Sequence, residues 1–156
     1  MAGNRVLVHF ELEGEPRGKG RPRFTGQRKK HTYTPQATID YEQAVQWAYK
    51  AAAGAFAFPA DTPLRLVVWA FMERPKSASR ITRQLMGAGK LRPTKKPDWD
   101  NIGKIVCDAL NGIAYGDDTQ IVDGRVIKLF CADGEQPHIS VTIAEAINPR
   151  EEKGGS

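Results

Sequence analysis

Two closely spaced aspartates followed by a lysine are the residues of this sequence best suited to carry out chemistry. They lie in the segment KKPDWDNIGK, residues 95–104. Asp98 and Asp100 are two positions apart in an extended approach to a predicted helix, so their side chains can point the same way. Lys104 follows Asp100 by four residues and therefore lies one turn further along the same helix face. We expect Lys104 to be exposed beside these carboxylates.

Two more acidic residues follow this helix, because Asp117 and Asp118 lie in the turn before the next predicted strand. Grouping several carboxylates is costly unless a cation is bound between them. Mg²⁺ favours a few carboxylates and keeps open positions for water and phosphate oxygens, and such a metal activates water for attack on a phosphodiester. The sequence does not itself show whether the turn brings Asp117 and Asp118 back to the earlier pair.

Each of these acidic residues also has an ordinary structural use. Asp100 stands where a helix N-cap belongs, Asp117 and Asp118 suit a turn, and Asp98 could be a surface charge. The D-x-D-N spacing alone therefore leaves both the catalytic and the structural interpretation open.

Several other side chains are assigned structural roles. Asp108 lies four residues beyond Lys104 and is expected to pair with it rather than bind a metal. Trp99 is expected to pack on the core rather than stack on a base. The two cysteines, Cys107 and Cys131, lack the spacing of a zinc site and are interpreted as small core residues. The three scattered histidines are not expected to be catalytic; they are His9, His31 and His138.

Positive charge is concentrated in two windows of the sequence. Residues 17–31 and 74–96 contain 15 of the 23 Lys and Arg residues and no acidic residue, in a chain of net charge +5. Phosphate is the obvious counter-charge for such blocks, which favours a nucleic-acid partner. The alternative is a solvated surface without a ligand.

The hydrophobic pattern predicts a mixture of strands and helices. Strands are predicted at residues 5–12, 64–72, 121–131 and 137–145, with the last two as a hairpin, and a short hairpin over 24–25 and 31–33. A helix is predicted from the N-cap Thr34 to Gly54, a short basic helix at 77–87, and an amphipathic helix at 101–111 whose N-cap is Asp100. Basic loops are expected at 16–23 and 90–97.

The length of 156 residues fits one compact domain. We assign it to residues 1–148 and expect a disordered tail at 149–156. No apolar run approaches the roughly 20 residues that span a bilayer, so we expect no membrane contact and a cytoplasmic location.

Three ordered motifs resemble the RusA family of Holliday-junction resolvases. They are KPDWDNIGK at 96–104, CDALNG at 107–112 and GDDTQIV at 116–122, and the early PRGKGRPRFT at 16–25 resembles the basic segment of phage-type members. The resemblance implies an α/β (α+β) fold with a mixed β-sheet packed by two main helices, and a homodimer.

The resemblance also implies a function: endonucleolytic resolution of four-way DNA junctions, in recombination and repair, by paired symmetric nicks that require Mg²⁺ or Mn²⁺. It assigns metal binding to Asp98, Asp100 and Asp118, a catalytic role to Lys104, and supporting roles to Asn101 and Asp117. We expect DNA contacts from Arg17, Lys19, Arg21, Arg23, Lys95 and Lys96. Two alternatives are a non-catalytic protein that binds branched DNA and a general nuclease acting on flaps or single strands.

Overall fold

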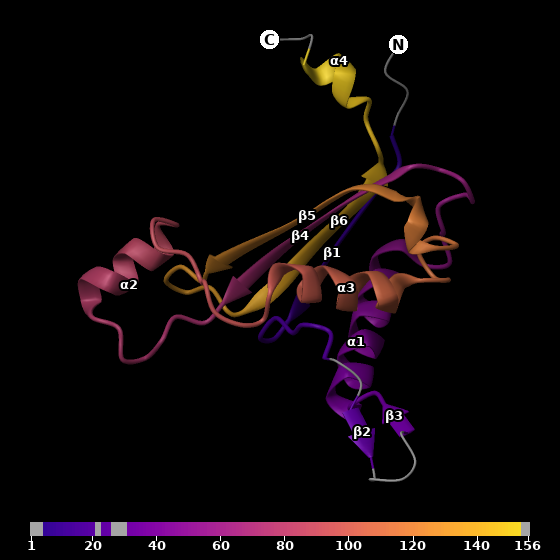
Figure 1. Cartoon of the computed structure of the whole chain (residues 1–156). Helices are drawn as coiled ribbons and strands as arrows, with labels where there is room; N and C mark the ends of the chain where they lie inside the picture. Colours follow the sequence, from indigo (N-terminus) through magenta and orange to yellow (C-terminus); the bar gives the residue numbers. More distant parts are fainter. Residues whose placement is uncertain (1–4, 21–22, 26–30, 154–156) are drawn as a thin grey trace.

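The chain folds around one four-stranded β-sheet that carries its main helices on one face (Figure 1). The computed structural model describes residues 5–20, 23–25 and 31–153. The sheet contains β1 (Leu7–Glu13), β4 (Leu64–Met72), β5 (Ile121–Phe130) and β6 (His138–Glu145), in the order β1-β6-β4-β5. Because β4 pairs with β5 in parallel and the other pairs are antiparallel, the sheet is mixed, as expected.

Two helices build the core against this sheet. α1 (Gln36–Ala53) packs on β1, α3 (Trp99–Leu110) packs on β5, and the two helices contact each other (Figure 1). The predicted apolar stripe of α3 is confirmed, since all five of its members are fully buried: Ile102, Ile105, Val106, Ala109 and Leu110. α3 therefore has one face fixed in the core, and its opposite face is free to carry polar groups.

The smaller elements lie outside this two-layer core. The short hairpin of β2 (Arg23–Thr25) and β3 (His31–Tyr33) is confirmed and projects from the body of the protein (Figure 1). α2 (Arg80–Gly87) is capped by Ser79, and the 3₁₀-helix η1 (Asp118–Gln120) precedes β5. Residues 149–153, expected in a disordered tail, form the short helix α4 (Pro149–Lys153), and 154–156 lie outside the described residues.

The predicted hairpin of the last two strands is wrong. β5 and β6 do not pair, because β4 lies between them and bonds to both. β4 alternates buried and half-exposed residues along its whole length, and its core-facing side is fully apolar. A strand with that much apolar surface is most stable in the middle of a sheet, where both of its edges are paired. The sequence closeness of β5 and β6 gave no sign of this insertion.

Two predicted helix caps are also wrong. Pro35, not Thr34, is the N-cap residue of α1, and it makes no side-chain cap. Asp98, not Asp100, is the N-cap residue of α3, so that Asp100 lies inside the first helical turn. None of the helices in the described part of the chain is long and apolar enough to cross a membrane.

Candidate active site

Asp98 and Asp100 lie at the start of α3, and both are exposed. The backbone of Asp98 is extended, and its side chain makes no cap hydrogen bond with the helix. Its carboxylate is therefore not used in holding the helix end. The positive end of the helix dipole favours negative charge at both positions. The helix thus stabilises two carboxylates at the surface without occupying the Asp98 oxygens.

Lys104 is on the exposed side of α3, as expected. Its side chain is 61% exposed, and its Nζ lies 3.5 Å from Oδ2 of Asp108 in the expected i,i+4 pair. Asp100, Lys104 and Asp108 follow one another at four-residue intervals, which places them along one face of the helix. Lys104 therefore lies between two acidic residues, Asp100 and Asp108, on this face.

Asp118 follows a segment that returns to α3, since the Tyr115 hydroxyl donates to the Cys107 backbone oxygen at 2.9 Å. The pKa of Asp118 is raised by partial burial, by a hydrogen bond with the Asp117 side chain, and by the negative charges of Asp117 and Asp108, while the charge of Lys104 lowers it. Asp118 therefore shares its electrostatic surroundings with the second half of α3. The turn does return toward the helix, which the sequence alone had left open.

The turn is held rigid by Asp117 and Gln120. The Asp117 side chain accepts a hydrogen bond from the Thr119 backbone and forms a capping box with Gln120. The side-chain amide of Gln120 also donates to the backbone oxygens of Pro59 and Thr62. Asp117 thus has a structural task in this turn.

The structure does not gather all the predicted carboxylates at one point. Within the described residues, no three His, Cys, Asp or Glu side chains are close enough together to hold a metal ion. The charged groups that shift the pKa of Asp118 are Asp117, Asp108 and Lys104. Asp98 and Asp100 lie at the other end of α3. The donor chemistry suits Mg²⁺, because all three assigned side chains are carboxylates.

Asp108 is more central than the sequence suggested. Oδ2 of Asp108 contacts Nζ of Lys104 and also Nζ of Lys19, the latter at 3.2 Å. The negative charge of Asp108 raises the pKa of Asp118. The four-residue spacing from Lys104 indicated the first contact. The contact with Lys19 joins residues far apart in the sequence and gave no local signal.

The Lys19 side chain forms ion pairs within the protein. Its side chain is 20% exposed and forms ion pairs with Glu42 of α1 and Asp108 of α3. Burial alone would lower the pKa of Lys19, but these two carboxylates together raise it. Lys19 was expected to contact DNA, and its ammonium group already has two acidic partners.

The other residues expected to contact DNA fall into two groups. Arg17, Lys95 and Lys96 are exposed, and the Lys95 backbone oxygen accepts a hydrogen bond from Lys128 of β5 at 2.6 Å. Arg21 lies outside the described residues, and Arg23 belongs to β2 but its side chain is not described.

A pocket of about 690 Å³ lies beside the start of α3. It is formed by the loop of residues 16–20 on one side and by residues 96–98 with Asn101 on the other. Arg17, Lys19 and Lys96 contribute positive charge and Asp98 contributes negative charge. The predicted DNA-binding loop and one predicted catalytic carboxylate therefore line the same hollow.

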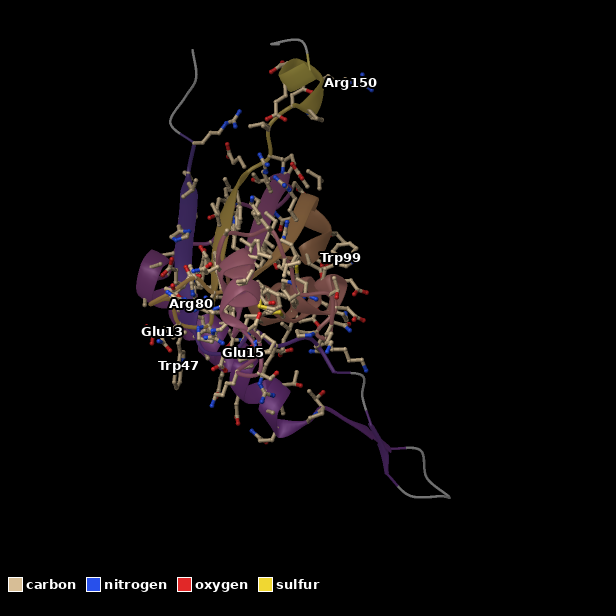
Figure 2. All side chains as sticks on the ribbon, turned by 90° about the vertical axis from the view of Figure 1, so that its left-hand side faces the viewer. Glu13, Glu15, Trp47, Arg80, Trp99 and Arg150 are labelled. Carbon is tan, nitrogen blue, oxygen red and sulfur yellow. The ribbon has the colours of Figure 1, made fainter. Side chains whose placement is uncertain are left out.

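Trp99 does not pack on the core as expected. Its side chain is 62% exposed, and it lies at the surface on the α3 side of the molecule (Figure 2). The core-facing positions of α3 begin only at Ile102. The indole is therefore accessible between the two aspartates.

The two cysteines lie in or against the core, as expected. Cys131 is buried and Cys107 half-buried, and burial raises the pKa of each thiol to about 11. His9 and His138 lie on strands of the sheet, away from α3, and the side chain of His31 is not described.

The chain was compared with known protein families and with individual known proteins. The profile of the family described as "Endodeoxyribonuclease RusA" matches residues 13–144, a span that includes the basic loop, α3 and η1. The chain is also 36% identical over 141 residues to "Uncharacterized protein YqaN" of Bacillus subtilis (strain 168), which covers 88% of this chain and 96% of that protein. The chain belongs to the RusA family of endodeoxyribonucleases.

Proposed function

We propose that this protein is a homodimeric nuclease that resolves four-way DNA junctions by paired symmetric nicks, with Mg²⁺ as cofactor and Mn²⁺ as a substitute. The observation that carries the proposal is the family match, whose span of residues 13–144 includes the basic loop, α3 and the Asp117–Asp118 turn. A two-fold dimer would present two equivalent sites to a two-fold junction, which suits a reaction that makes two cuts.

Asp98, Asp100 and Asp118 are the proposed metal ligands, and Asn101 and Asp117 support them. When bound, the metal would polarise the phosphoryl group and activate water. We assign to Lys104 the stabilisation of negative charge that develops on the phosphate. In support, its ammonium group is exposed and its only ion-pair partner among the described residues is Asp108. Asp117 holds the turn, as its capping bonds indicate.

The proposed DNA contacts come from the exposed side chains of Arg17, Lys95 and Lys96, and from Arg21 and Arg23 of the same basic segment. Phosphate contacts of this kind supply affinity without reading sequence. Lys19 belongs to the same basic loop, but its ammonium group is already paired with Glu42 and Asp108.

The first test is cleavage of a labelled four-way junction in Mg²⁺ by the wild type and by Asp100→Asn. Symmetric paired nicks from the wild type alone, with junction binding retained in the variant, are the expected result. Equal cleavage by both proteins would show that the metal-site assignment is wrong.

The choice of substrate separates the remaining alternatives. Junction, flap, duplex and single-stranded DNA are compared at equal concentration. Preference for flaps or single strands would indicate a general nuclease. Tight junction binding without cleavage in either Mg²⁺ or Mn²⁺ would indicate a non-catalytic DNA-binding protein.

A further inference from the structure

The basic loop of residues 16–20 is fastened to α3 at several points. The backbone N–H of Lys19 donates to the Asn101 oxygen at 2.9 Å, and its side chain forms ion pairs with Glu42 and Asp108. These bonds tie one residue of the loop to α1 and to both ends of α3.

Close packing of Gly18 adds to these bonds. A Cβ atom at Gly18 would lie 2.9 Å from Cβ of Asn101, closer than real Cβ atoms approach, and 3.0 Å from Cβ of Pro97, which is tighter than most such contacts. At Gly20, two residues further on, the nearest atom to an added Cβ is Oγ1 of Thr38 at 3.8 Å, an ordinary contact. Only Gly18 therefore lets the loop lie directly on the start of α3.

Lys95, the residue before the opposite wall of the pocket, is fastened to β5. Nζ of Lys128 donates to the Lys95 oxygen at 2.6 Å, and Nε of Arg92 donates to the Lys128 oxygen at 2.7 Å. These bonds leave the side chains of Arg17 and Lys96 exposed. Both residues line the hollow of about 690 Å³, and so does Asp98.

We propose that this pocket binds, through Arg17 and Lys96, a backbone phosphate of the DNA that is adjacent to the phosphate at which the strand is cut. Lys19 is the positioning residue that keeps the pocket in shape. The proposal rests on the nuclease function proposed above. A phosphate fits because the two accessible cations exceed the single accessible carboxylate. Lys19 acts through its partners, because Glu42 and Asp108 already engage its ammonium group.

The position of Glu42 provides a test of the role of Lys19. Removing a negative charge from a DNA-binding protein ordinarily strengthens DNA binding. If Lys19 positions the loop, Glu42→Gln should instead weaken junction binding, by roughly tenfold. The matched control is Asp40→Asn, which removes the same charge from the same helix outside these ion pairs. Stronger binding by both variants would overturn the positioning role.

Limited trypsin digestion measures loop docking without DNA. Cleavage after Arg17 should be roughly tenfold faster in Gly18→Ala and in Glu42→Gln than in the wild type, because the loop then opens more often. Gly20→Ala should keep the wild-type rate, and circular dichroism checks that each variant folds. Unchanged cleavage in both Gly18→Ala and Glu42→Gln would show that the loop is not held as proposed, whatever the protein does to DNA.

Neutral phosphates identify the occupant of the pocket. Junctions that carry one methylphosphonate at successive positions are bound in metal-free buffer by the wild type and by Arg17→Ala/Lys96→Ala. At one position the neutral group should weaken wild-type binding roughly tenfold and have no further effect on the double variant. If no position behaves in this way, the pocket does not hold a phosphate. Because binding is measured, this result is independent of whether the junction is cut.

Discussion

Nζ of Lys104 lies 3.5 Å from Oδ2 of Asp108, one helical turn further along α3. The same carboxylate oxygen lies 3.2 Å from Nζ of Lys19, and the negative charge of Asp108 also raises the pKa of Asp118. Asp108 therefore connects the proposed catalytic lysine to the basic loop. A substitution of Asp108 should therefore affect both DNA cleavage and DNA binding at the pocket.

Removing the Lys104 ammonium group should impair cleavage far more than folding. We expect Lys104→Met to lower kcat by roughly 10²–10³-fold, the usual effect of losing one group that stabilises transition-state charge. The exposed pair with Asp108 contributes only about 0.5 kcal/mol or less to stability. Single-turnover cleavage and thermal unfolding measure the two effects. A kcat within a factor of about two of the wild type would remove Lys104 from the mechanism.

Exposed cations at the pocket should set the salt dependence of DNA binding. Arg17→Glu and Lys96→Glu should each weaken junction binding and flatten the plot of log affinity against log salt, since fewer counterions are released. Lys50→Glu, at the far end of α1, is the matched charge reversal away from the pocket. An equal change of slope in all three variants would mean that only net charge matters.

The contact between Arg74 and Asp133 should make stability depend on pH. Nη2 of Arg74 donates to Oδ1 of Asp133 at 2.7 Å, and this bond with the arginine charge lowers the pKa of Asp133. The stabilisation is therefore present above the ordinary aspartate pKa and is lost as the pH falls through the lowered value. The Tm difference between wild type and Asp133→Asn should shrink on acidification. A difference that stays constant with pH would contradict the assignment.

Both thiols should react slowly in the folded protein. Burial raises the pKa of Cys107 and Cys131 to about 11, so little thiolate exists near neutral pH. Allowing for the greater nucleophilicity of a more basic thiolate, alkylation at pH 8 should be about tenfold slower than for the unfolded chain. The rate should rise as the pH approaches the raised pKa. Rapid labelling of native protein would instead indicate an exposed, activated cysteine.

Local sequence patterns were sufficient for the four strands of the sheet, for α1 and for the core face of α3. The five-residue apolar stripe of that helix is fully buried, and β4 occupies the predicted residues 64–72. Such periodicities depend on neighbours along the chain, and they can therefore be read without knowing the fold. The motifs around Asp98, Asp100 and Asp118 likewise led to the family that the profile match shows. Their roles in the reaction stay predictions.

Only the tertiary structure decided how distant segments meet. β4 separates β5 from β6, Lys19 pairs with Glu42 and Asp108, and Asp118 returns to the second half of α3. Each of these contacts joins residues well separated in sequence. Strand order and ion pairing of this kind depend on which apolar surfaces are buried against each other. The sequence determined which residues can do chemistry, and the packing of α1 and α3 on the sheet determined which of them stand together.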